Sequence, residues 1–209
     1  MLTSGGFFGL SRVAILDMLL TLFMSLALCC FFWGQRAVDG GKGRIPFLLM
    51  YAALGAATLT KGPIGVLLPA VVILFYLFLA KRWVLLRHME FALGIPLFLV
   101  TAAPWYVLAE LRNPGYLNHF FWQENVARFT TTQFRRGGPW YYFIAVLSVG
   151  FLPWTIFLPT TIARLWKQRR AEEQLFLALW IALPLLFFSL SSSKLFHYIL
   201  PIYPALAII

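Results

Sequence analysis

The sequence contains few charged residues. Asp, Glu, Lys and Arg together make up only 11% of its 209 residues, against about 25% in an ordinary soluble domain. Hydrophobic residues account for 61% of the chain, and the mean hydropathy is +0.82. A water-soluble core could not enclose this much apolar surface. The composition therefore excludes a soluble globular domain and predicts an integral membrane protein.

Cysteine and histidine are also scarce. The chain has two cysteines and three histidines. Cys29 and Cys30 are adjacent inside an apolar run, a spacing that suits neither a metal site nor a disulfide framework. His88 belongs to the opposite side of the predicted membrane from His119 and His197. We therefore predict no metal site and no cofactor, and leave open whether a divalent metal is required.

The basic residues favour lipid over nucleic acid as a partner. The formal net charge is +10, but Lys and Arg are scattered between apolar runs rather than gathered on one face. Such scattering is typical of membrane topology signals and of contact with anionic lipid headgroups. We therefore predict membrane lipids as partners and no binding of nucleic acid.

About seven apolar runs follow one another along the chain. They cover residues 18–33, 46–58, 64–80, 91–108, 140–162, 174–190 and 198–209. The second run is rich in small residues (AALGAAT), which suits close helix packing. The last run stops after 12 residues, whereas a spanning helix needs about 20. We predict an all-α polytopic membrane protein, with one transmembrane domain over residues 1–209 and a truncated last span.

The connectors between the runs alternate between two sides of the membrane. Turns 34–45, 81–90 and 163–173 share one side and hold ten of the seventeen Lys and Arg, so the positive-inside rule makes that side cytoplasmic. The other side receives the segments with unusual chemistry, which are 12–17, 60–63, the loop 104–139 and 191–198. Because this outer side keeps seven cations, we predict an anionic ligand there, best met by a phosphate or pyrophosphate on a lipid.

Two candidate residues of the outer side lie at the ends of apolar runs. Asp17 is either a carboxylate favoured by the dipole at a helix start or a general base or orienting group at a catalytic face. Lys61 lies between Thr60 and Gly62-Pro63. It either snorkels from a helix end or binds phosphate, helped by free N–H groups at the start of the next helix.

Two further groups lie in the outer loop and near the last helix. Glu124 and Arg128 are i,i+4 partners on a short helix, which is either an interfacial helix with a surface ion pair or a lid over a sugar-phosphate. Lys194, His197 and Tyr198 follow three serines at a helix exit. Lys194 can snorkel there, and His197 could donate a proton, bind phosphate or ligate a metal.

Four segments occur in an order that resembles a known family. They are RVAILD, LTKGPIG, PWY…FFWQENVARF and SSSKLFHYILPIYPALAI. Together they resemble the bacterial membrane glycosyltransferases of the dolichyl-phosphate-mannose protein mannosyltransferase type, and most closely the branch of the lipid A aminoarabinose transferases. The resemblance implies a GT-C fold in the bacterial inner membrane. It also implies transfer of a sugar from a polyprenyl-phosphate carrier to a lipid (lipid A-like) or protein acceptor at the periplasmic face.

The resemblance also implies roles for individual residues. Asp17 is similar to the second acidic position of the family and is the predicted catalytic residue. The residues predicted to bind the carrier phosphate are Lys61, Arg128 and Lys194. Those predicted to bind substrate are Arg12, Glu124, Asn125, His197 and Tyr198. The chain departs from the family pattern at Asn125, where the aminoarabinose branch often has His, and at Phe196, where Pro is common.

Two alternatives remain. The family's principal catalytic acid precedes the region that this sequence resembles, so the chain resembles the middle of such an enzyme and could be a non-catalytic fragment. A membrane transporter or lipid flippase would share the helices and the basic outer side. It should also place ionisable residues at the middle of the membrane, whereas the charges here lie at the ends of the runs.

Overall fold

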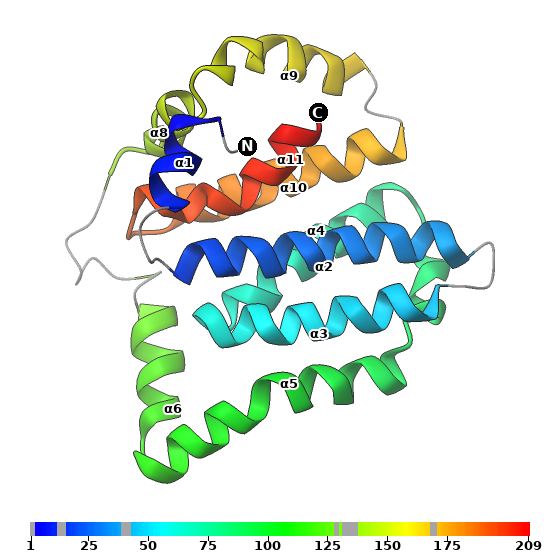
Figure 1. Ribbon diagram of the computed structural model, residues 1–209, viewed down its shortest axis with the longest axis vertical. Helices are drawn as coiled ribbons and strands as arrows, with labels where there is room; N and C mark the ends of the chain where they lie inside the picture. The colour runs from blue at the N-terminus through cyan, green and yellow to red at the C-terminus, as the bar shows by residue number, and fades with distance from the viewer. Residues whose placement is uncertain (1–2, 12–15, 39–42, 128–129, 131–137, 168–170) are drawn as a thin grey trace. The chain divides into compact units, whose positions relative to one another are not determined.

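The computed structural model describes residues 3–11, 16–38, 43–127, 130, 138–167 and 171–209. These residues form helices joined by turns, with no strand among them, which confirms the prediction of an all-α chain (Figure 1). The chain divides into two compact units, and the division falls inside one helix. We call Leu19–Arg128 the central unit, and Met1–Met18 together with Phe129–Ile209 the terminal unit. The single domain predicted for residues 1–209 stays a prediction.

The central unit is a set of long apolar helices joined by short turns. Its helices are α2 (Leu16–Val38, from Leu19 onward), α3 (Arg44–Lys61), α4 (Ile64–Leu79), η1 (Trp83–His88), α5 (Phe91–Arg112), α6 (Tyr116–Asn118) and η2 (His119–Ala127). Helix α3 packs against both α4 and α5. A Cβ atom added to Gly55 of α3 would lie 2.7 Å from Cβ of Thr101 in α5. The small residues of α3 thus allow the close approach that the sequence predicted.

The terminal unit contains shorter and more broken helices. They are α1 (Gly5–Ser11), α8 (Tyr142–Gly150), η3 (Trp154–Phe157), α9 (Leu158–Lys167), α10 (Glu172–Leu190), η4 (Phe196–Ile202) and α11 (Tyr203–Ile208). The long helix α10 packs against η4 and α11. The indole Nε1 of buried Trp180 in α10 donates a hydrogen bond to the carbonyl of Pro201, at 2.9 Å. Helices α1 and α8 approach closely at Gly6 and Gly150.

The apolar run over residues 140–162 is not one continuous helix. Helix α8 ends at Gly150, and the chain resumes in η3 and α9 after a bend of 116°. Pro153 explains the break, because a proline lacks the N–H of a helical hydrogen bond and its ring collides with the preceding turn. The N–H groups of Phe151 and Leu152 still bond to Leu147 and Val149 of α8, and the helix stops there.

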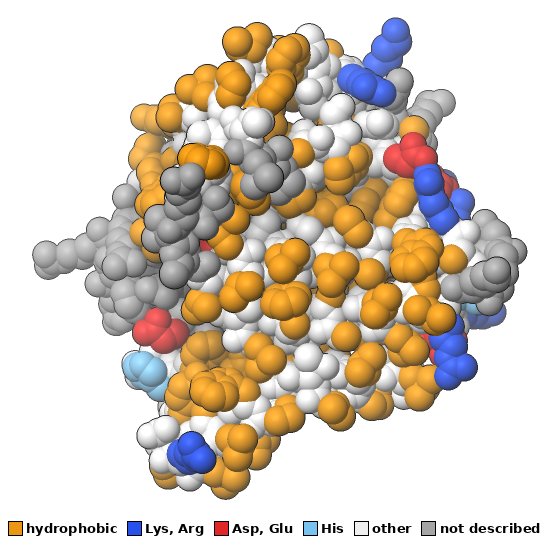
Figure 2. Space-filling view, in the orientation of Figure 1, with side chains coloured by type: hydrophobic (Ala, Val, Ile, Leu, Met, Phe, Trp, Pro, Cys, Tyr) orange, Lys and Arg blue, Asp and Glu red, His pale blue; other side chains and the backbone are white. Residues whose placement is uncertain are grey.

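The described helices carry the surface of a membrane protein. By length and composition, α2, α5 and α10 could each cross a membrane, and the bent pair of α8 with η3–α9 makes a fourth if it is one span. Leu99, Val100 and Leu111 of α5 are at least half exposed. Figure 2 shows apolar side chains across the helices of the central unit, with charged side chains toward the helix ends. This pattern suits contact with hydrocarbon along the helices and with water or headgroups at their ends.

Candidate active site

The turn that holds Lys61 is fixed by glycine and proline. Helix α3 ends at Lys61, and Gly62 adopts φ 78° and ψ −152°, a conformation that is essentially restricted to glycine. The Gly62 N–H donates to the carbonyl of Thr58 at 2.8 Å. Pro63 then leads directly into α4. The local sequence thus places the lysine, half-buried, where one helix stops and the next begins.

The amide groups that follow this turn are already engaged. The N–H of Gly65 donates to the carbonyl of Gly62 at 3.0 Å, and those of Val66 and Leu67 donate to the carbonyl of Pro63 at 3.1 and 2.9 Å. The expectation that these N–H groups are free for an anion is therefore wrong for all three. Anion binding at this turn would depend on the Lys61 ammonium rather than on these backbone donors.

The outer loop packs directly onto the Lys61 turn. A Cβ atom added to Gly62 would lie 2.8 Å from the ring of Phe120 and 3.5 Å from the amide nitrogen of Asn125. The Tyr106 hydroxyl donates to the Thr58 carbonyl at 2.7 Å, and its ring lies 5.7 Å from that of Phe120. Two segments that the sequence assigned to one side of the membrane are therefore in contact within the central unit.

The predicted loop helix is present, but its turns are wider than those of an α-helix. Helix η2, His119–Ala127, is a π-helix, in which residues five apart stack above one another. The Asn125 side chain follows this spacing, because its Nδ2 donates to the carbonyl of Phe120 at 2.7 Å. Glu124 and Asn125 are half-buried. Arg128 lies outside the described residues, so its pairing with Glu124 and its contact with phosphate stay predictions.

Asp17 lies beside His197 in the terminal unit. The carboxylate, in the first turn of α2, is buried with 4% exposure. Its Oδ2 is 3.6 Å from the imidazole Nε2 of His197, at the start of η4. This contact joins the first and the last of the segments predicted to share the outer side. Arg12, the other predicted substrate residue near Asp17, lies outside the described residues.

Lys194 connects the same C-terminal segment to the end of the outer loop. Its ammonium donates to the carbonyl of Gly138 at 3.0 Å. The preceding serines form a tight turn in which Ser191 Oγ donates to the carbonyl of Ser193 at 3.1 Å. An ammonium has three N–H donors, so this bond is compatible with a second acceptor. The predicted phosphate contact of Lys194 and the substrate role of buried Tyr198 stay predictions.

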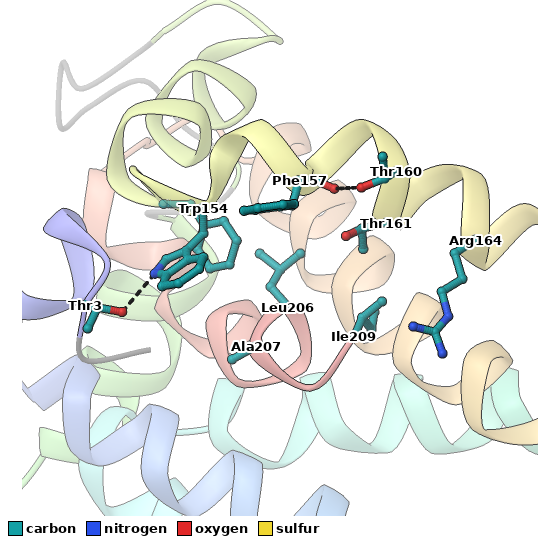
Figure 3. A pocket seen from close by; sticks show the side chains of 10 residues that line it. Thr3, Trp154, Phe157, Thr160, Thr161, Arg164, Leu206, Ala207 and Ile209 are labelled. Carbon is teal, nitrogen blue, oxygen red and sulfur yellow. Dashed lines mark hydrogen bonds between the residues drawn. The ribbon is translucent and has the colours of Figure 1, made fainter.

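Two cavities of the terminal unit are lined by none of the predicted site residues. One cavity of about 620 Å³ lies among η3, α9 and α11 (Figure 3). Thr161 and Arg164 project from α9 toward the side on which Leu206 and Ile209 lie. A second, more apolar cavity of about 640 Å³ follows the glycines of α1. Sequence reasoning missed the first cavity, although polar residues three apart on a helix (Thr161 and Arg164) were a signal that could have indicated it.

Metal ligands are not gathered anywhere in the described part of the chain. No group of three or more His, Cys, Asp or Glu side chains there has the arrangement of a metal site. The residues that the structure does bring together are a carboxylate with an imidazole in one unit, and a lysine turn with an amide and aromatic rings in the other.

Apolar helices with polar and ionisable residues at their ends define a polytopic membrane protein, and each of the two units has candidate residues at its helix ends. Within that class, the chain belongs to the dolichyl-phosphate-mannose-protein mannosyltransferase family, whose sequence model matches residues 1–120. This confirms the family that the four sequence segments indicated.

Curated relatives place the similarity in one branch of the family. The chain is 35% identical over 97% of its length to the undecaprenyl phosphate-alpha-4-amino-4-deoxy-L-arabinose arabinosyl transferase of Aeromonas hydrophila. It is 37% identical over 96% of its length to the protein of the same name from Pseudomonas aeruginosa. It spans only 37% and 36% of the length of these relatives.

A solved structure shares the fold. The crystal structure of ArnT from Cupriavidus metallidurans bound to undecaprenyl phosphate matches 92% of this chain with a TM-score of 0.82 and 36% sequence identity, over 35% of the ArnT chain. The apo structure of the same protein matches with a TM-score of 0.78. The predicted GT-C-type membrane fold is therefore confirmed.

Proposed function

We propose that this chain is part of a glycosyltransferase that moves a sugar from a polyprenyl-phosphate carrier to a lipid A-like lipid or a protein. The observation that carries the proposal is the similarity of nearly the whole chain to ArnT bound to undecaprenyl phosphate. The names of the curated relatives favour 4-amino-4-deoxy-L-arabinose as the sugar and undecaprenyl phosphate as the carrier. The reaction would be a pentosyl transfer that needs no nucleotide sugar.

The cations would supply the main chemical assistance. When the sugar leaves the carrier, negative charge develops on the phosphate, and fixed cations in a site sheltered from water stabilise that charge. The Gly62 turn and the loop packed against it fix the backbone next to Lys61, and the lysine would then meet the carrier phosphate. Arg128 and Lys194 are the further proposed phosphate ligands. Asp17 would orient the acceptor or act as a base toward it.

The remaining outer residues would contact the sugar or the acceptor. Glu124 and Asn125 lie on the loop helix next to the Lys61 turn, and both side chains can accept hydrogen bonds from sugar hydroxyls. The site would face the periplasm, because the cation-rich turns lie at the opposite ends of the helices. The protein would then reside in the inner membrane of a bacterium.

The proposal is tested with the full-length gene product in proteoliposomes. The donor is undecaprenyl phosphate-linked aminoarabinose, the acceptor is lipid A, and mass spectrometry measures the gain of one pentose. Lys61→Ala should abolish transfer, since no other group of this turn is proposed to meet the phosphate. Lys167→Ala is the matched control, because Lys167 is an exposed lysine at the end of α9, and it should retain full transfer.

Three results would count against the proposal. Full activity of Lys61→Ala would remove the phosphate role of that lysine. Absence of pentose transfer by the wild-type protein, with transfer of mannose from a polyprenyl-phosphate donor to a peptide instead, would replace the aminoarabinose branch by the protein mannosyltransferases. Movement of labelled lipid across the bilayer without any sugar transfer would support a flippase.

A further inference from the structure

Asp17 and His197 meet although they lie near opposite ends of the chain. The Nε2–Oδ2 distance is 3.6 Å, just beyond the range of a hydrogen bond, and a small rotation of either side chain would bring the two atoms within that range. The exposed fractions of the two side chains are 6% for Asp17 and 17% for His197. A carboxylate removed from water in this way requires partners that replace its hydration, and the imidazole of His197 lies where a small rotation would make it one of them.

The His197 ring is held by aromatic neighbours that do not belong to α2. Its centroid lies 5.2 Å from the rings of both Phe196 and Tyr198, each meeting it nearly edge-on at 79° and 84°. Tyr198 in turn packs against Phe188 of α10 at 5.2 Å. The imidazole is therefore positioned by α10 and η4, and it presents its Nε2 to the carboxylate at the start of α2.

The segment that contains His197 has a second anchor three residues earlier. The Lys194 ammonium bonds to the carbonyl of Gly138, and the Ser191–Ser193 turn fixes the backbone between α10 and these two side chains. Residues 191–198 thus connect the start of α2 with the end of the outer loop inside the terminal unit. A side chain in such a place is better suited to orienting a neighbouring group than to binding a sugar.

We propose that His197 is a positioning residue for Asp17. It holds the Oδ2 side of the carboxylate, so that Asp17 keeps one orientation at the outer end of α2 while the acceptor binds. His197 then acts on the reaction through Asp17 and makes no contact with the carrier phosphate. This inference rests on the proposed transferase function, in which Asp17 acts on the acceptor.

The kinetic test is a double-mutant cycle in the full-length gene product. His197→Ala should lower kcat about tenfold, with little change in KM for the carrier. A tenfold loss lies near the middle of the range of coupling energies between residues in direct contact. His197→Gln should recover part of the loss, because its side-chain N–H can still reach the carboxylate. In the Asp17→Asn background, His197→Ala should cause no further loss. His88→Ala, an exposed histidine of η1, is the matched control and should leave kcat unchanged.

Two kinetic results would overturn the proposal. If the losses of Asp17→Asn and His197→Ala multiply, His197 acts independently of the carboxylate. If Asp17→Asn retains full transfer, Asp17 is not needed for the reaction, and His197 cannot act on the reaction by positioning it.

A second measurement reads the contact without relying on activity. In protein labelled with ¹⁵N-histidine, Asp17→Asn should move the imidazole nitrogen shifts of His197 and leave those of His88 and His119 in place. An unchanged His197 shift would overturn the contact itself. A protein that transfers no sugar but shows the shift would instead contradict the proposed function, so the two failures are distinguishable.

Discussion

Replacing Gly62 by alanine should damage the Lys61 turn through two separate effects. The first effect is conformational, because Gly62 has φ 78° and ψ −152°, a region in which a residue with a side chain is strained by about 1 to 3 kcal/mol. The second is steric, since the new Cβ would lie 2.8 Å from two ring atoms of Phe120. Overpacking of this kind costs about 1 to 3 kcal/mol. The total loss of stability should be about 2 to 6 kcal/mol.

Gly115→Ala separates the two effects. Gly115 also has a positive φ, 92°, but an added Cβ would meet nothing within 4 Å. Its loss should therefore be the conformational part alone, about 1 to 2 kcal/mol. Thermal unfolding of both variants in the same detergent, followed by circular dichroism, measures the difference. It should be about the steric cost of 1 to 3 kcal/mol, with Gly62→Ala the less stable variant.

Comparing the two variants tests whether the outer loop packs against the Lys61 turn. If Gly62→Ala and Gly115→Ala lowered Tm equally, Phe120 would not press on the turn, and the reasoning would be refuted. At a temperature where both variants are folded, Gly62→Ala should also lose sugar transfer, because the turn sets the place of Lys61. Gly115→Ala should retain it.

Three further substitutions test the packing of individual helices, each by thermal unfolding in detergent. Gly65→Ala should destabilise strongly, by about 3 kcal/mol or more, since its Cβ would collide with the backbone of Ala57 in α3. Gly9→Ala is its control, because an added Cβ there meets nothing within 4 Å, and it should be neutral or slightly stabilising. Tyr106→Phe should cost about 1 kcal/mol, the value of one hydrogen bond. Trp180→Phe should cost roughly 2 to 3 kcal/mol, since it removes a buried hydrogen bond and part of a fully buried ring. A loss below about 0.5 kcal/mol, the lower limit for one hydrogen bond, would contradict that packing.

The sequence predicted the helices well because hydrophobic length is a strong signal in membrane proteins. The run 174–190 appears as α10, and the run 64–80 appears as α4. The break between α8 and α9 was missed because a single proline among apolar residues hardly changes the average hydropathy of the run. Pro153 and Gly150 were visible in the sequence, but whether a proline kinks or ends a helix depends on what packs beside it.

The sequence predicted which segments of the candidate site lie close together better than it predicted the contacts between individual side chains. Alternation of the connectors correctly indicated that residue 17 lies near residues 191–198, and that the Lys61 turn lies near the outer loop. The particular partner of Asp17 was not predictable, because hydropathy gives the side of a connector but not the rotation of each helix. The hydrogen bond from Lys194 to the Gly138 carbonyl was also not predictable, because every residue has a backbone carbonyl and the sequence does not indicate which one accepts.

The π-helix of the outer loop changes how sequence variation in this segment should be understood. Each turn of this π-helix, His119–Ala127, holds about one more residue than an α-turn. Removing one residue between these positions could restore an α-turn and still allow a folded loop. Every later side chain of that helix would, however, rotate to a new face, and Glu124 would exchange its direction with a neighbour. A single-residue gap in this segment between two related proteins would therefore change the directions of the later side chains as well as the length of the loop.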